Sequence, residues 1–279
     1  MAPVYFLLHV PKCAGSSLIG HVSSHLGERA IAAPGQIGWR RNAFGNQYGF
    51  DPESPAFRAA QVFHGHPLSV SLKSLLPGRE IRETVLLRDP VGYFVSMYNF
   101  RVMRARAGEG PESPPFPAWY AASRKNPISR FLLYRYFEQG VPGLYRFSSA
   151  GRLAWLEARL GAFWYVGSYR RVGELVGLLG QELGFPGNPK KRNVDSAGAV
   201  RVAELGEDLC HQIMRENAVD QLLFERWADR GADGAANPAP LTEGLSGADQ
   251  PAQLFDEARI GALKAWQRHV QGFNRRGWG

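Results

Sequence analysis

Residues 4–18 read VYFLLHVPKCAGSSL, and the order of residue types in this stretch decides the fold. Its first half is apolar and rich in residues that favour strands, which predicts a buried strand. The segment PKCAG that follows is typical of a turn, and Ser16 and Ser17 are residue types that cap helices. We therefore expect a helix as far as about His25, so the stretch predicts the order strand, loop, helix.

The same order recurs further along the chain. Residues 83–87 form a second apolar run, which ends at Arg88 and is followed by a helical pattern. Shorter strands are predicted at 61–67 and 163–167, and an amphipathic helix at 174–183. Strands that alternate with helices favour a parallel sheet covered on both faces. We expect an α/β fold: a P-loop-like three-layer α/β/α arrangement with a central parallel sheet. A helical C-terminal region is predicted from patterns at 200–230 and 252–270.

One domain accounts for the length and composition. The chain has 279 residues, of which 44% are hydrophobic, enough for one sizeable core. We expect a single domain over residues 1–279, with loop insertions near 29–60 and 101–127. The second insertion is rich in Arg, Pro and Gly, which suggests a mobile segment instead of core. A flexible linker is predicted near 231–251.

The charge and the cysteines restrict the class of protein. Lys and Arg number 33 against 25 Asp and Glu, a formal charge of +8 that favours a polyanionic ligand without identifying it. Only two cysteines, Cys13 and Cys210, occur, which fits a reducing compartment. The first apolar run is too short to span a bilayer and lacks the features of a signal peptide. We expect a bacterial cytoplasmic protein, although a chain whose targeting segment had been removed would look the same.

The loop after the first strand is suited to an anion. It brings backbone N–H groups and a helix N-terminus together, and Lys12, Ser16 and Ser17 add a charge and two hydroxyls. A tight turn with a helix cap is the alternative interpretation. A Walker A loop has its Lys directly before Ser or Thr, whereas Lys12 precedes Gly15, so the order argues against an ordinary ATPase or kinase.

Residues 9–18, HVPKCAGSSL, resemble the 5′-phosphosulfate loop of the PAPS-dependent sulfotransferases, particularly the branch with the heparan 2-O-sulfotransferases. PAPS is 3′-phosphoadenosine 5′-phosphosulfate. Cys13 stands where that family often has Thr, and a structural role for its side chain is favoured over a catalytic one. The resemblance implies that the donor is held by Lys12, Cys13, Ala14, Gly15, Ser16, Ser17 and Leu18.

Two further segments are similar to the nucleotide-binding parts of that family. Arg88, at the end of a strand, and Ser96, eight positions later, match the motif for the 3′-phosphate. A guanidinium fork and a hydroxyl suit a phosphate without the family, and a surface Arg–Asp pair is the alternative. Lys191, Arg192 and Asn193 fall where the family has a basic loop over the nucleotide, although such a run is more often a solvated loop.

Residues 63–66, FHGH, resemble the segment in which a histidine of the heparan branch acts as catalytic base. His66 is our first choice, because a neutral imidazole can take the proton of an acceptor hydroxyl. His64 is the second choice, and we expect only one of the two histidines to face the site. A metal pair lacks clustered partner ligands, and His9, His21 and His25 are interpreted as surface or core histidines.

The resemblance implies an enzyme, a PAPS-dependent sulfotransferase that moves a sulfuryl group to an acceptor hydroxyl by in-line displacement. The acceptor would be a glycan or glycolipid, the second product adenosine 3′,5′-bisphosphate, and no metal would be required. We expect no specific nucleic acid and no transmembrane segment, and the oligomeric state is left open. The alternatives are a P-loop-like nucleotide kinase, a sulfotransferase-like protein without catalysis, and a basic nucleotide- or nucleic-acid-binding protein. The last would use Arg101, Arg104, Arg106, Arg124 and Arg130.

Overall fold

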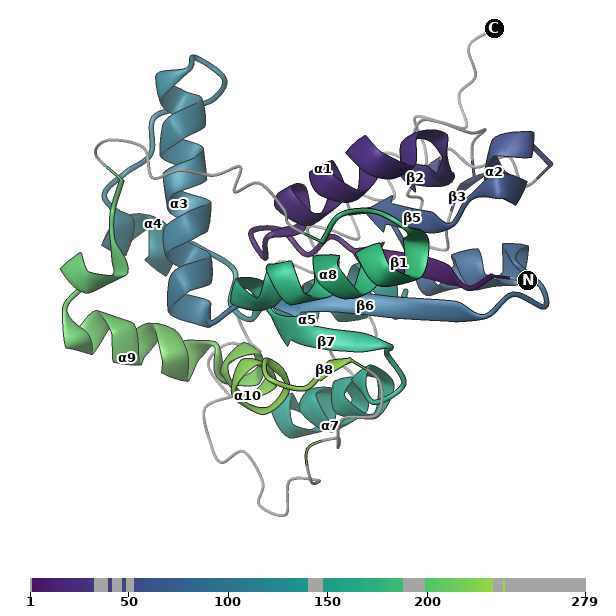
Figure 1. Ribbon diagram of the computed structural model, residues 1–279. Coiled ribbons are helices and arrows are strands. Elements are labelled where there is room, and N and C mark those ends of the chain that lie inside the picture. Colours follow the sequence, from purple (N-terminus) through teal and green to yellow (C-terminus); the bar gives the residue numbers. More distant parts are fainter. Residues whose placement is uncertain are drawn as a thin grey trace, which may run out of the picture.

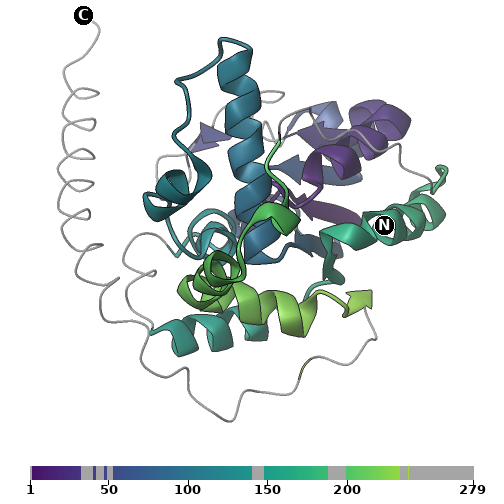
Figure 2. The same cartoon turned by 90° about the vertical axis from the view of Figure 1, so that its left-hand side faces the viewer.

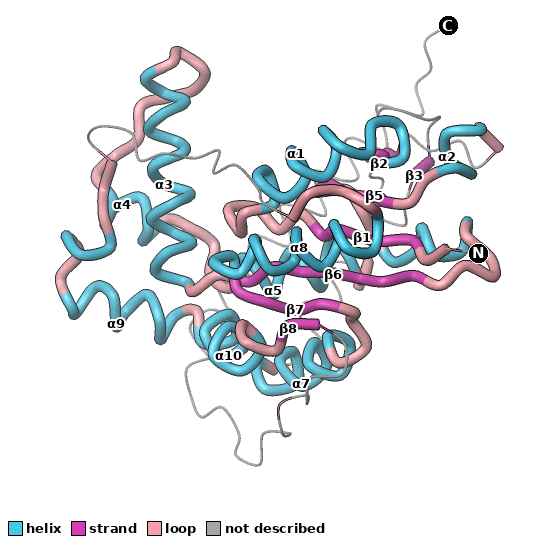
Figure 3. The backbone as a smooth tube through the Cα atoms, in the orientation of Figure 1, coloured by secondary structure: helices cyan, strands magenta, loops and turns pink. Residues whose placement is uncertain are grey.

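The computed structural model has an α/β fold, in which helices lie on both sides of a mostly parallel sheet (Figures 1 and 3). The structure describes residues 2–32, 40–41, 47–48, 53–139, 148–187, 199–232 and 238. Three predicted site residues, Lys191, Arg192 and Asn193, lie outside the described residues, as do the helix expected at 252–270 and most of the linker near 231–251. Within the described residues, no helix is both long and apolar enough to cross a membrane.

In the described part of the chain, the sheet has six strands in the order β2-β5-β1-β6-β7-β8, of which only β8 runs antiparallel to its neighbour. Every residue of the central strand β1 is buried, as expected for a strand covered on both faces. The predicted strands near 4–10, 61–67, 83–87 and 163–167 are confirmed. The bounds are β1 (Val4–Leu8), β2 (Ala30–Ala32), β5 (Val62–Gly65), β6 (Ile81–Leu87), β7 (Tyr165–Ser168) and β8 (Gly231–Ala232).

Helices α1 (Gly15–Leu26) and α8 (Val172–Leu183) lie on one face of the sheet, and α5 (Pro127–Phe131), α7 (Ser149–Leu160) and α10 (Ala218–Trp227) lie on the other (Figure 1). α5 continues into η3 (Leu132–Tyr136), a π-helical turn. The remaining short elements are η1 (Gly27–Arg29), β3 (Arg40–Arg41), β4 (Gln47–Tyr48), α2 (Pro55–Ala59), η2 (Val70–Leu75), η4 (Tyr169–Arg171) and η5 (Val202–Glu204).

Helix α3 (Pro90–Arg106) rises from the end of β6 and stands away from the sheet, beside α4 (Phe116–Ala121) and α9 (Glu207–Glu216) (Figures 1 and 2). Its start is fixed by Asp89, whose side chain accepts a hydrogen bond from the Gly92 amide at 2.6 Å, and by proline at the first helical position. The helix therefore begins directly at the carboxyl edge of the sheet.

The expectation that the segment near 101–127 lies outside the core is wrong. α3 continues through Arg106, and α4 buries Phe116 and Tyr120 against it. The ring centroids of Tyr98 and Phe116 are 5.3 Å apart, and those of Phe94 and Tyr120 are 4.9 Å apart. Aromatic residues spaced four apart anchor the segment, although its composition is typical of a loop.

The segment near 29–60 also contains a strand that was predicted as loop. Residues Ala30–Ala32 pair in parallel with β5 and form the edge of the sheet. Three small or branched residues are too few to show a period of two, so the sequence pattern could not identify this strand.

The carboxyl ends of the parallel strands meet at one edge. Leu8, the last residue of β1, is level with Gly65 of β5 and with Val85 of β6. The chain leaves β1 through α1 toward β2, whereas β6 lies on the other side of β1. The strand order thus reverses between β1 and β6, and in open α/β sheets ligands bind outside the carboxyl ends at such a point.

Candidate functional site

The loop between β1 and α1 has two residues in the left-handed backbone region. Lys12 and Ala14 have φ values of 63° and 62°, and neither is glycine. Each such residue costs roughly 1–2 kcal/mol, and strain of this kind gathers at functional sites. Ala14 is the residue before α1 and makes no side-chain cap. The predicted cap by Ser16 and Ser17 is wrong, because the helix already begins at Gly15 and includes both serines.

The N-terminus of α1 is therefore open. In the described chain, the amides of Gly15 and Ser16 have no hydrogen-bond acceptor, and the hydroxyls of Ser16 and Ser17 have no partner. The first amides of a helix point along its axis and attract anions. The loop thus offers backbone and hydroxyl donors at the carboxyl edge of the sheet.

Lys12 places its charge beside this opening. Its Nζ lies 4.4 Å from the ring centroid of Phe100, and no ion pair to it exists within the described residues. Burial lowers the pKa of Lys12, and the charge of Arg88 lowers it further. The ammonium group is thus held near a second cation without a neutralising carboxylate, an arrangement that favours a bound anion.

Cys13 and Leu18 belong to the interior. Cys13 is 1% exposed and Leu18 is 3% exposed. Burial raises the pKa of the Cys13 thiol, so this side chain is a neutral core group and not a thiolate nucleophile. The amides of the two residues donate within the loop, from Cys13 to the Val10 carbonyl and from Leu18 to the Ala14 carbonyl.

Arg88 connects the loop to the neighbouring strands. Its Nη1 donates to the Lys12 carbonyl at 2.9 Å, and its guanidinium carbon lies 4.2 Å from the ring centroid of Tyr169, just after β7. Its Nε is buried and has no hydrogen-bond partner among the described residues. An unpaired buried donor costs about 1–3 kcal/mol, but the Nε of Arg79 has the same feature, so it does not by itself indicate a ligand.

Ser96 lies in the second turn of α3, and no hydrogen bond joins it to Arg88 in the described chain. Three residues further on, Asn99 donates to the Val200 carbonyl at 2.8 Å and accepts from the Val200 amide at 3.0 Å. These two hydrogen bonds hold Val200, which follows the predicted basic loop along the chain, against α3. The loop itself, with Lys191, Arg192 and Asn193, lies outside the described residues.

His66 is held by His9, a residue that sequence reasoning assigned no role. Nδ1 of His66 lies 2.6 Å from the His9 carbonyl oxygen, and the two rings stack with centroids 4.0 Å apart. A carbonyl only accepts, so Nδ1 of His66 carries the hydrogen and Nε2 is the basic nitrogen of the neutral ring. Burial, and then the neighbouring His66, lower the pKa of His9 to about 4, so His9 is neutral near pH 7.

The same His9 ring explains the glycine of the loop. A Cβ atom at Gly15 would overlap the His9 ring, whereas the φ of Gly15 is not positive. Glycine is therefore needed here because there is no room for a side chain, and not because of its backbone conformation. Gly15 lets the helix N-terminus approach His9, and His9 in turn supports His66, so the anion loop and the histidine pair form one packed unit.

His64 lies in β5, beneath α1. It is 6% exposed, and its Nε2 lies 3.3 Å from the Ser23 hydroxyl of α1. Burial lowers its pKa to about 4. The structure thus brings His66, and not His64, to the open edge. Two residues that are two apart in a strand share a face, but His66 lies beyond the end of β5, after Gly65, whose φ of 126° changes the direction of the chain.

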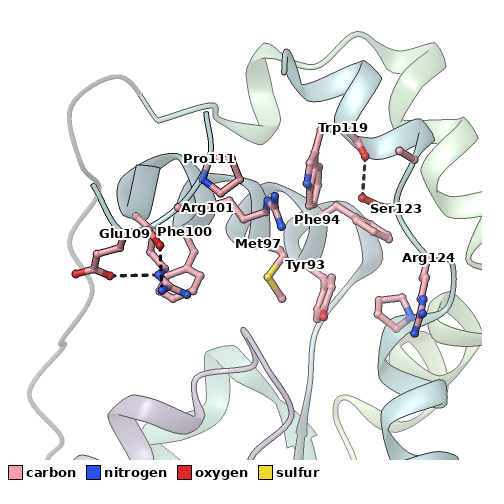
Figure 4. A pocket seen from close by; sticks show the side chains of 14 residues that line it. Tyr93, Phe94, Met97, Phe100, Arg101, Glu109, Pro111, Trp119, Ser123 and Arg124 are labelled. Carbon is pink, nitrogen blue, oxygen red and sulfur yellow. Dashed lines mark hydrogen bonds and ion pairs between the residues drawn. The ribbon is translucent and has the colours of Figure 1, made fainter. Parts of the chain in front are cut away.

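An open cavity of about 650 Å³ lies between α3, α4 and the segments next to them (Figure 4). Phe100 belongs to its wall and also carries the Lys12 ammonium on its ring. Pro127, the first residue of α5, also lines the cavity, and Phe131 at the end of α5 contacts His66 with ring centroids 6.3 Å apart. The cavity therefore borders the loop through Phe100, and α5 connects its lining to the histidine pair.

Comparison with known proteins gives no relative: no protein-family model and no curated protein matches the chain. Within the described residues, no group of three or more His, Cys, Asp or Glu side chains is arranged to hold a metal ion. The bacterial origin and the cytoplasmic location stay predictions.

Proposed function

We propose that the chain is a PAPS-dependent sulfotransferase whose donor is held at the carboxyl edge of β5, β1 and β6. The observation that carries the proposal is the convergence of three groups from three strands: the open loop after β1, Arg88 after β6, and His66 after β5. The strand-loop-helix order at this edge also supports the P-loop-like form of the fold.

The donor fits the groups present. PAPS would supply the sulfuryl group and two phosphates. The open amides of Gly15 and Ser16, with the Lys12 ammonium, suit the 5′-phosphosulfate, and the Arg88 guanidinium beside this loop suits a further phosphate oxygen. Ser96, Lys191, Arg192 and Asn193 stay predicted contacts of the 3′-phosphate and adenine.

In the proposed reaction His66 is the general base. The acceptor hydroxyl gives its proton to Nε2 as its oxygen bonds to sulfur, and the bond from sulfur to the 5′-phosphate oxygen breaks. Lys12 and the loop amides stabilise the charge that develops on that oxygen. The bond from Nδ1 to the His9 carbonyl keeps the ring in place and becomes stronger when the ring is charged.

Calorimetric titration with adenosine 3′,5′-bisphosphate tests the donor site. We expect micromolar binding that exceeds ATP binding, and a loss of about tenfold or more in Lys12→Ala and Arg88→Lys, because the second change keeps the charge but removes the fork. Arg159→Lys, at an exposed position of α7, is the matched control. Preference for ATP with Mg²⁺ would favour the kinase instead. Salt-dependent oligonucleotide binding without bisphosphate binding would favour the basic binding protein.

A further inference from the structure

The cavity beside α3 has an apolar wall of aromatic side chains. Figure 4 shows Tyr93, Phe94, Met97 and Trp119 along it, and Phe100 beside Arg101. Phe100 is 37% exposed, a large fraction for a phenylalanine in a folded chain. A volume of about 650 Å³ is within the usual range for small-molecule sites. Such a wall favours a flat apolar body over a fully hydroxylated one.

The charged groups of the cavity are mostly basic. Arg101, Arg104 and Arg124 line it. Arg104 is neutralised by Glu109, at 3.2 Å from Nε to Oε2. Arg101 and Arg124 have no partner within the described residues. Two guanidinium groups beside an aromatic wall favour a ligand that carries a carboxylate or a similar anion.

The position of the cavity connects it to the proposed chemistry. Lys12 marks its border with the loop. From Pro127 to Phe131, which faces His66, the chain advances four residues along α5, or about 6 Å at the rise of an α-helix. The ring of His66 lies a further 6.3 Å from that of Phe131, so an elongated acceptor that extends from the aromatic wall past α5 would bring its hydroxyl to His66.

We propose that this cavity binds the acceptor, and that the acceptor is a hydroxylated aromatic acid; this inference rests on the proposed function. Its ring packs against Phe100 and Trp119, its carboxylate is bound by Arg101 and Arg124, and its hydroxyl is directed toward His66. This assignment differs from the glycan or glycolipid expected from the sequence, because a glycan lacks the apolar ring that the wall fits.

Calorimetry with p-hydroxycinnamate tests the assignment without PAPS. Its methyl ester has the same ring without the charge, and glucuronate has the charge without the ring. We expect p-hydroxycinnamate to bind about tenfold more tightly than the ester, as a charge-assisted contact requires, and glucuronate to bind more weakly still. Equal binding of acid and ester, or equal binding of glucuronate, would overturn the assignment.

Variants place the binding in the cavity. Arg101→Gln and Arg124→Gln should each weaken p-hydroxycinnamate about fivefold or more and leave the ester unchanged, while Arg159→Gln on α7 should change neither. The bisphosphate titration is run separately on each variant and should be unaffected. If p-hydroxycinnamate fails while the bisphosphate binds, only the acceptor class is wrong. If p-hydroxycinnamate binds but the bisphosphate does not, both the donor site and the role of the cavity as an acceptor site are rejected.

Discussion

Gly15 is where the loop between β1 and α1 packs against the histidine pair. The ring of His9 occupies the space that a side chain at this position would need. We predict that Gly15→Ala destabilises the protein by roughly 1–3 kcal/mol and weakens adenosine bisphosphate binding about tenfold, since the loop must move away. The matched control is Gly173→Ala in α8, where a Cβ atom meets nothing within 4 Å and helix propensity favours Ala. Urea unfolding and calorimetry measure the two effects.

The double variant His9→Ala with Gly15→Ala separates the overlap from other effects. Removing the ring makes room for the new Cβ atom, so the Gly15→Ala change should cost much less in the His9→Ala background. If the two losses of unfolding free energy are simply additive, the packing of His9 on the loop is not the reason for glycine.

In the proposed reaction, His66 acts as the base and does not hold the donor. We predict that His66→Ala lowers the release of adenosine bisphosphate from PAPS, with p-hydroxycinnamate as acceptor, by about 10²–10⁴-fold and leaves bisphosphate affinity unchanged. His211→Ala, at an exposed position of α9, is the control. A loss of affinity equal to the loss of turnover would make His66 a binding residue instead of the base.

Helix α5 depends on a carboxylate from another element. Asp220 of α10 is 2% exposed and accepts from the amides of Ile128 and Ser129, each at 2.8 Å. We predict that Asp220→Ala costs roughly 2–4 kcal/mol in urea unfolding, because two buried amides lose their acceptor. Asp208→Ala, exposed in the first turn of α9, should cost less than about 1 kcal/mol. Equal costs would show that the cap contributes little.

Which elements can be predicted depends on how local their signal is. The strand and helix around residues 4–18 and the helix of 174–183 were predicted correctly, because each buries a face that its own spacing reveals. α4 was missed, although Phe116 and Tyr120 are four residues apart, because the prolines and arginines around them suggested a loop. The signal for this helix was present, but only its packing against α3 decides the outcome.

The candidate site was predictable to the extent that it follows from topology. Arg88, His66 and the Lys12 loop each follow an apolar run, and the carboxyl ends of parallel strands share one edge. The role of His9 was not predictable, because it depends on contacts with Gly15 and His66 that no local pattern encodes. The cavity likewise combines α3 with residues from segments that were expected to be mobile.

At the scale of the whole molecule, buried histidines link the stability of the fold to acid. Burial lowers the pKa values of His9 and His64 to about 4, below the value of about 6.5 expected in the unfolded chain. Between about pH 6.5 and pH 4 the unfolded chain binds protons on both rings that the fold excludes, so stability falls on acidification. Asp220 has the opposite effect on stability. Burial raises its pKa to about 6, so on acidification the folded chain takes up this proton before the unfolded chain does, and the fold gains stability.

The two imidazoles together outweigh the single carboxyl group, so we predict a net loss of unfolding free energy between pH 7 and pH 4.5, measured by urea titration at several pH values. His64→Gln removes one titrating ring from the interior and should make this loss smaller, while Asp220→Asn removes the opposing group and should make it larger. The matched control His211→Gln, on the exposed surface of α9, should leave the pH dependence unchanged. If the loss of unfolding free energy between pH 7 and pH 4.5 is the same in His64→Gln and in the unaltered protein, His64 is excluded as its source. The cause would then lie in titrating groups other than this histidine beneath α1.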